Sequence, residues 1–326
     1  MIDHAHRIEQ WDRYWAYGNL HSFSQVHPGN YRGAIAALWQ DVFAHLPDDS
    51  RVIDIATGNG AIPLLALDAA ERAGRHLRIS AFDLATIDPF SQIEDEATRE
   101  RLRAVDFHPR VPAEQLPLAD AVADLACSQF GIEYSDLDRS IAELGRVVRP
   151  GGGVALVTHH RGSIFLAHFE EEATQIDFVM NELKLYLKTR NLLRAMADAG
   201  GVGARTPKVV KKRKAVDEAL KRVQQAAQRT SHPDMLVGPA RYVREILEAT
   251  PRTAPSQLLQ WLDEARERVL AQDQRMRDMH AAARTDEDIR HLRGLLETVG
   301  FTDVATEPLR QSDGSILGWC VTARRS

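Results

Sequence analysis

The sequence predicts an α/β fold: a seven-stranded, mostly parallel sheet that ends in an antiparallel hairpin, with a large helical insertion between strands 5 and 6. Short, continuously apolar segments alternate with helical patterns over residues 50–160, which is typical of a parallel sheet covered on both faces. Residues 163–299 are almost wholly helical in pattern and highly charged. The chain then closes with two apolar segments around a Ser-Asp-Gly turn, which predicts the hairpin.

The composition narrows the class of protein. The 326 residues are enough for two domains, or for one domain with a large insertion. With 41 basic and 46 acidic residues the net charge is −5, which argues against a general nucleic-acid binder. The two cysteines, Cys127 and Cys320, lack ligand spacing, so we expect neither a disulfide framework nor a zinc site. Without a signal peptide or a bilayer-length apolar run, we expect a cytoplasmic protein with no membrane partner; the sequence gives no oligomeric state.

The predicted elements begin with a helical cap over residues 1–48. Its first helix, residues 3–18, is rich in aromatic residues, and its second, residues 30–46, has apolar residues at helical spacing. The sheet core is predicted over residues 49–162. Its strands are expected at 51–56, 78–84, 102–107, 122–130 and 152–160, with helices at 61–74 and 136–148.

The remaining elements are the insertion, predicted over residues 163–285, and a closing segment over residues 286–326. Thr285 followed by "DED" is a helix-capping signal, and Gly300 ends that helix. The hairpin strands follow at residues 302–310 and 316–325.

The stretch "RVIDIATGNGAIP" is the most informative part of the core. A strand that ends in glycines and leads into a helix directs backbone N–H groups and the positive helix end toward a ligand. Asp54 lies in the strand, and Gly58 and Gly60 lie in the turn. Compared with the dinucleotide pattern G-x-G-x-x-G, the third glycine is replaced by Pro63, so a nucleotide turn is indicated but a nicotinamide cofactor is not.

In this stretch the sequence resembles the class I S-adenosylmethionine-dependent methyltransferases, whose first motif is roughly apolar-apolar-(D/E)-apolar-G-x-G-x-G. "VIDIATGNG" fits that motif, with Ala56 at the first glycine. The resemblance implies a Rossmann-like fold, S-adenosylmethionine as cofactor, and a loop of Ala56, Gly58 and Gly60 beneath the methionyl part. It also implies that Asp54 helps to organise the ammonium end.

Later segments resemble further motifs of this family. Asp83, followed by Leu84, ends strand 2, where an acid accepts hydrogen bonds from the ribose hydroxyls; a helix N-cap is the alternative. "QLPLADAVADLACSQF" resembles the third and fourth motifs and brings Ser128 to the expected cofactor site. The acid that often meets the adenine amino group would fall at a proline, so Glu114 or a backbone carbonyl is expected there instead. "RPGG", residues 149–152, resembles the turn before strand 5.

The predicted substrate chemistry lies at the ends of strands 4 and 5. His159 or His160 is the candidate base that removes a proton from the methyl acceptor, and Glu133 is a candidate contact for a substrate amine or guanidinium. The alternatives are that one histidine packs under the insertion while the other is solvated, and that Glu133 is an ordinary turn acid. We predict no metal site.

The resemblance and these residues predict a methyltransferase that acts on a small organic molecule by in-line transfer to oxygen or nitrogen. The helical insertion would form a lid. Three alternatives stay open: a macromolecule methyltransferase that uses the basic segment 208–224, an NAD-dependent oxidoreductase, and a non-catalytic cofactor-binding protein. The aromatic residues of the first helix would either cap the bound ligands or pack on the insertion.

Overall fold

The computed structural model describes residues 4–22, 29–200, 205–250 and 252–326. The chain divides into two compact units, Met1–Ile164 with His280–Ser326 and Phe165–Met279.

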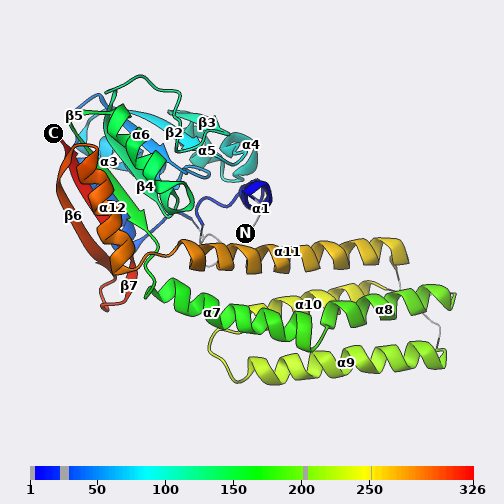
Figure 1. Cartoon of the computed structure of the whole chain (residues 1–326). Helices are drawn as coiled ribbons and strands as arrows, with labels where there is room; N and C mark the ends of the chain where they lie inside the picture. The colour runs from blue at the N-terminus through cyan, green and yellow to red at the C-terminus, as the bar shows by residue number, and fades with distance from the viewer. Residues whose placement is uncertain (1–3, 23–28, 201–204, 251) are drawn as a thin grey trace. The chain divides into compact units, whose positions relative to one another are not determined.

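The first unit is built on a seven-stranded sheet in the order β3-β2-β1-β4-β5-β7-β6 (Figure 1). The neighbours from β3 to β5 are parallel, whereas β7 is antiparallel to both β5 and β6. The predicted fold class, including the closing hairpin, is therefore confirmed. The strands are β1 (Ser50–Ile55), β2 (Leu77–Asp83), β3 (Val105–Pro109), β4 (Ala123–Gln129), β5 (Val148–Thr158), β6 (Phe301–Arg310) and β7 (Ile316–Arg325).

Helices cover both faces of this sheet because alternate residues of its strands are apolar on both sides. On one face, side chains of α6 and α12 pack with Ile53 of β1 and Leu156 of β5 in a common core. On the other face lie α2 and α3, and Trp39 of α2 bonds to Gln129 of β4. The helices of this unit are α1 (His4–Ala16), α2 (Gly33–Ala44), α3 (Ala61–Ala73), α4 (Pro89–Gln92), α5 (Glu96–Leu102), the short 3-10 helix η1 (Ile132–Tyr134), α6 (Leu137–Val147) and α12 (Asp286–Thr298).

Two local predictions were wrong. The third strand was expected at 102–107, but Leu102 ends α5 and β3 occupies Val105–Pro109, because the apolar spacing of "LRAVDF" suits either element. The segment 149–152 was expected as a free turn. It lies inside β5 as an irregularity: Val148 pairs with Ala123, and the next pair joins Gly153 to Leu125, with Gly151 at φ 79° in between.

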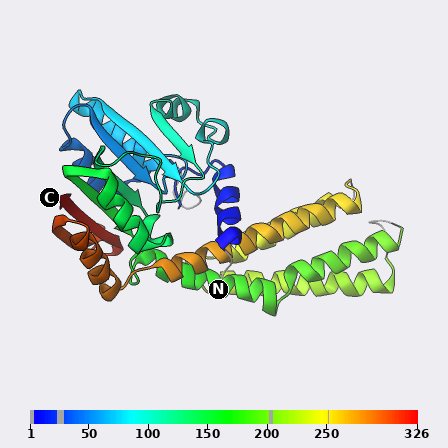
Figure 2. The same ribbon diagram turned by 45° about the horizontal axis from the view of Figure 1, so that its top comes forward.

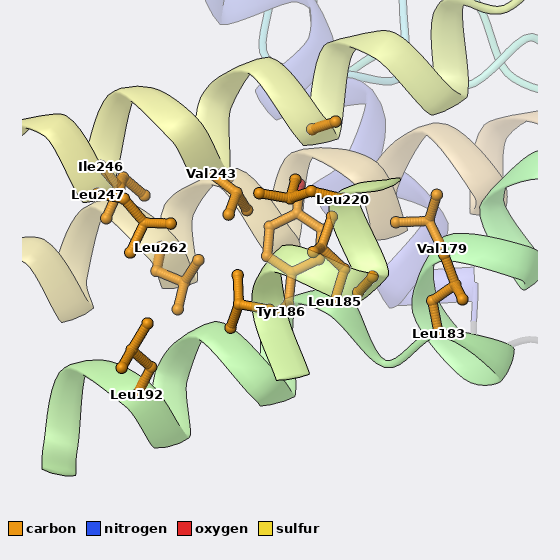
Figure 3. Packing of buried hydrophobic residues seen from close by; sticks show 14 of the residues in the cluster. Val179, Leu183, Leu185, Tyr186, Leu192, Leu220, Val243, Ile246, Leu247 and Leu262 are labelled. Carbon is orange, nitrogen blue, oxygen red and sulfur yellow. The ribbon is translucent and has the colours of Figure 1, made fainter. Parts of the chain in front are cut away.

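The second unit is a set of helices with a hydrophobic core of its own (Figures 2 and 3). Figure 3 shows Tyr186, Leu220, Val243 and Leu262, from four different helices, directed into this core. The elements are α7 (Ile164–Asp177), the π-helical turn η2 (Phe178–Glu182), α8 (Leu185–Asp198), α9 (Pro207–Ala227), α10 (Asp234–Ala249) and α11 (Pro255–Ala282).

The predicted insertion, 163–285, extends slightly beyond this unit at both ends. The helices α7 and α11 cross the boundaries of the unit without a break, so the sequence pattern does not change there. None of the helices in the described part of the chain is long and apolar enough to cross a membrane.

Candidate functional site

A hollow lies at the carboxyl edge of the sheet, where the strand order reverses between β1 and β4. Crevices at such switch points are where open α/β sheets bind ligands. The hollow has about 1030 Å³ of empty space, counted out to the solvent at its mouth, which is ample for a nucleotide-sized ligand. Every residue of its wall belongs to the first unit, and the polar and aromatic ones include Trp11, Trp15, Tyr31, Asp54, Asp83 and Gln129.

The loop between β1 and α3 forms the floor and depends on left-handed backbone at three positions. Ala56, Gly58 and Gly60 have φ values of 55°, 57° and 93°. A Cβ on Gly58 would lie 2.5 Å from the ring of Trp15, and one on Gly60 would lie 2.8 Å from Leu102 and Phe107. Ala56 lines the hollow, and the two glycines shape the loop from behind. The predicted glycines are thus required by the backbone and by close packing.

Two buried carboxyl groups stand at this floor. Asp54, at the end of β1, is 1% exposed, and burial raises its pKa to about 7. Its Oδ1 accepts a weak bond from the Cys127 thiol, while Oδ2 has no hydrogen-bond partner. Asp83, at the end of β2, is 7% exposed, and burial raises its pKa to about 6. It accepts the N–H groups of Gly58 and Ala85, each at 2.8 Å, so it joins the end of β2 to the glycine loop.

The other predicted cofactor residues lie in different settings. Leu84 and Glu114 line the hollow beside Asp83, and Glu114 also accepts the N–H of Asp136 at 2.8 Å. Ser128 is fully buried behind the wall. Its hydroxyl donates to Ile55 O at 2.8 Å and accepts Ile132 N–H at 3.1 Å, so it joins the ends of β1 and β4.

The aromatic residues of α1 form part of the wall. Trp11 and Trp15 line the hollow, with ring centroids 5.6 Å apart, and Trp11 meets the edge of Tyr134 at 5.9 Å. Asn59 fixes the end of this helix, because its fully buried amide donates to Trp15 O at 3.0 Å and to Asn19 O at 2.8 Å. Of the two roles left open for these aromatic residues, this geometry favours the cap.

The predicted base His159 lies beneath the hollow. Its ring is 1% exposed and stacks on Phe130 at 4.3 Å, and Phe130 lines the hollow above it. Burial lowers the pKa of His159 to about 3, so the imidazole is neutral. Glu133 is also buried, and burial raises its pKa to about 7. Its Oε1 accepts the backbone N–H of His159 at 2.8 Å.

The second candidate base, His160, points elsewhere. Its ring stacks on Trp319 at 4.6 Å, and its Nδ1 accepts the N–H of Gly162 at 2.8 Å. Partial burial lowers its pKa. Among the residues that the structure describes, none of the three predicted catalytic side chains, His159, His160 or Glu133, lines the hollow.

Three residues of the site were not predicted from the sequence. Gln129 ends β4 with a buried amide whose oxygen accepts the indole N–H of Trp39 at 2.6 Å. Tyr31 stacks on His21 at 4.2 Å, and burial raises its pKa well above the usual value. Asn59 holds α1. The "GNG" motif contained a signal for Asn59, since a polar residue between two glycines faces the protein interior here.

One group in the second unit offers metal ligands, although no metal site was predicted. Side-chain ligand atoms of His168, Glu172 and Asp234 lie within 4.8 Å of one another. His168 and Glu172, one helical turn apart, are separated by 3.2 Å, which is also the geometry of an ordinary ion pair.

With this geometry in place, the comparisons with known proteins can be read. Residues 53–156 match the family model of a methyltransferase domain. The chain belongs to the class I S-adenosylmethionine-dependent methyltransferases. The cofactor of this methyltransferase family is S-adenosylmethionine, as the resemblance implied.

The methyltransferase has curated relatives in bacteria. The malonyl-[acyl-carrier protein] O-methyltransferase of Pseudescherichia vulneris is 33% identical over 114 residues, which are 35% of this chain and 40% of the relative. The ubiquinone/menaquinone biosynthesis C-methyltransferase UbiE of Rickettsia felis is 26% identical over 125 residues, 35% of this chain and 47% of the relative. The chain therefore spans less than half the length of either relative.

Among solved structures, the methyltransferase is similar to the 1,6-didemethyltoxoflavin-N1-methyltransferase of Burkholderia thailandensis with bound 1,6-didemethyltoxoflavin and S-adenosylhomocysteine. The TM-score is 0.45 at 11% identity, covering 99% of this chain and 89% of the other. The strand order of the sheet is the firmer evidence for the fold.

Proposed function

We propose that the protein transfers a methyl group from S-adenosylmethionine to a small organic molecule, at an oxygen or nitrogen atom. The observation that carries the proposal is the hollow at the β1–β4 switch point, which combines the methyltransferase loop with the buried carboxyl groups of Asp54 and Asp83. The aromatic and apolar wall suits an uncharged organic acceptor of modest size.

The residues of the hollow fit the cofactor. Asp54 has a buried oxygen without a partner, so an ammonium group there would compensate the cost of its burial. Asp83 stands on the other side of the β1 loop, where each of its oxygens keeps a lone pair for a ribose hydroxyl.

When bound, S-adenosylmethionine supplies an electrophilic methyl group on a sulfonium. The chain's own part is to align the acceptor and to exclude water. Trp11 and Trp15 cover the glycine loop, and Tyr31, Phe130 and Tyr134 complete an aromatic wall around the reacting space. Since an in-line displacement needs the acceptor atom opposite the sulfonium, rigid rings that fix its approach contribute to the rate.

Calorimetry tests the cofactor assignment. We expect the protein to bind S-adenosylmethionine and S-adenosylhomocysteine and not NAD. Binding of NAD in place of S-adenosylmethionine would overturn the proposal, because the same sheet edge would then serve a nicotinamide cofactor.

The proposed base has its own test. His159→Ala and His160→Ala are compared for turnover, with cofactor affinity measured alongside. Loss of turnover at unchanged affinity in one variant supports that histidine as the base. Full turnover in both would exclude a histidine base, and the buried position of His159 favours its role as a neutral support for Phe130.

A second candidate substrate is one carried by an acidic protein. The malonyl-[acyl-carrier protein] O-methyltransferases act, by their name, on a carrier-bound substrate. In this chain α9 exposes Lys208, Lys211, Arg213, Lys214 and Lys221, a basic surface within an acidic chain. Salt-sensitive binding of acyl-carrier protein, weakened by Lys211→Glu with Lys214→Glu, would favour this substrate.

A further inference from the structure

Gln129 is a buried donor in the wall of the hollow, and its orientation is fixed by chemistry. Its side chain is 7% exposed, and one polar atom lies 2.6 Å from the indole nitrogen of Trp39. An indole N–H can only donate, so the atom facing it is the amide oxygen. The NH₂ group therefore faces away from Trp39. It is buried and has no hydrogen-bond partner in the described chain.

A second buried polar atom without a partner stands at the same hollow. Asp54 Oδ2 is an acceptor, and Gln129 Nε2 is a donor. Asp54 pairs in register with Cys127, so Gln129 lies two residues further along β4, at the level of Ala56. An acceptor and a donor at this spacing complement the two ends of an α-amino acid, since an ammonium donates and a carboxylate accepts.

The position along the sheet indicates which end of the cofactor lies there. In the order β2-β1-β4, Asp83 stands on one side of the β1 loop and Gln129 on the other. If the ribose lies at Asp83, as the proposed function holds, the amino-acid end extends toward β4.

We propose that Gln129 donates a hydrogen bond to the α-carboxylate of the cofactor's methionyl group, while Trp39 holds the amide in the orientation required. This inference rests on the proposed function. Burying an amide NH₂ without a partner is unfavourable, and a carboxylate acceptor removes that cost on binding. Gln129 is thus a ligand-binding residue, and Trp39 acts through it as a positioning residue.

The decisive experiment compares two ligands that differ by a single group. S-adenosylhomocysteine and its decarboxylated analogue both carry the ammonium, and only the first carries the carboxylate. In the wild type we expect the analogue to bind roughly 10- to 100-fold more weakly, the range of a hydrogen bond to a charged group. In Gln129→Glu, which keeps the shape and still accepts the Trp39 N–H, we expect that preference to disappear.

Two further variants sharpen the test. Gln115→Glu adds the same charge at an exposed site near the hollow and should keep the wild-type preference. Trp39→Phe leaves Gln129 in place without its indole partner and should reduce the preference partially. Circular dichroism of each variant shows that the fold is retained.

The alternatives give different results. If Gln129→Glu binds S-adenosylhomocysteine like the wild type, the amide serves another group, such as an oxygen of the methyl acceptor, and the inference fails while the proposed function stands. Equal weakening of both ligands would also overturn it, as a general distortion. A wild type that binds neither S-adenosylmethionine nor S-adenosylhomocysteine would overturn the proposed function itself.

Discussion

At the scale of single residues, Ala56 shows what a motif departure means physically. The sequence comparison treats alanine for glycine as one added methyl group. The structure adds that Ala56 has φ 55°, a conformation that costs an L-residue about 1–2 kcal/mol. Its methyl also occupies the space beside Gly131, where a new Cβ would lie 2.4 Å from Ala56 Cβ. The alanine at the first glycine position is therefore coupled to a glycine 75 positions later, beyond the reach of motif reasoning.

That coupling predicts the outcome of a double-mutant cycle. Gly131→Ala should lower the free energy of unfolding by about 1–3 kcal/mol, the usual cost of overpacking. Ala56→Gly removes the opposing methyl, so Gly131→Ala should cost clearly less in that background. Urea denaturation of the four proteins measures the interaction energy. Strictly additive effects would show that the two methyl positions do not compete.

The buried carboxyl of Asp54 predicts a pH dependence. Its pKa rises from 3.8 to about 7 on folding, so between these values the folded chain binds more protons than the unfolded chain. Stability should therefore fall as pH rises from about 4 to 7, and stay lower above 7. Asp54→Asn should reduce this fall and stabilise the ligand-free protein at pH 8 by on the order of 1–3 kcal/mol.

The same variant gives a control within one protein. Asp54→Asn should bind S-adenosylhomocysteine more weakly than the wild type, because the amide does not attract the ammonium as a carboxylate does. Denaturation across pH, with and without this ligand, measures both effects. A variant as pH-sensitive as the wild type would show that Glu133 and Asp83, also raised, dominate the profile.

At the scale of elements, the first helix is held by a single side chain from the glycine loop. Asn59→Ala would remove two hydrogen bonds to the carbonyls of Trp15 and Asn19 and should cost about 1–3 kcal/mol. Hydrogen exchange in residues 8–16 should accelerate, and cofactor affinity should fall, because Trp11 and Trp15 lose their fixed position over the loop. Asn181→Ala, which removes an exposed bond to Asp177, serves as the matched control and should change neither. Unchanged exchange in α1 after Asn59→Ala would refute the anchor.

Elements marked by local chemistry were predictable from the sequence. Thr285 and Asp288 form the expected capping box at the start of α12, and the Ser-Asp-Gly turn closes the β6–β7 hairpin. The misplaced third strand and the irregular start of β5 depend instead on pairing with β2 and β4, which no local pattern encodes.

At the scale of the whole molecule, the same division separates what could be predicted of the site. The β1 loop and the acid at the end of β2 were recognisable because their backbone requires those residue types in one short segment. Gln129 and its partner Trp39 are 90 residues apart, and Tyr31 meets the hollow from the loop before α2. Such residues become part of a site only when packing brings distant segments together.

The two units predict the effect of removing one of them. All residues that line the hollow belong to the first unit, and the second has a separate core. The chain leaves and re-enters the first unit at neighbouring points, since Arg161 bonds to His280 O at 2.5 Å and to Arg284 O at 3.0 Å. A linker of about four to six residues in place of 165–279 should therefore close without strain.

We expect the shortened protein to unfold cooperatively and to bind S-adenosylhomocysteine within a few-fold of the intact chain, as calorimetry and thermal denaturation would measure. Leu292→Asp in the same background is the control: Leu292 is 2% exposed in the core shared by α6 and α12, so this change should abolish both folding and binding. If the shortened protein folds but has lost the ligand, the helical unit supports the cofactor site itself. Retained binding with lost methyl transfer would instead assign the helical unit to the acceptor, because only the acceptor's contacts would then be missing.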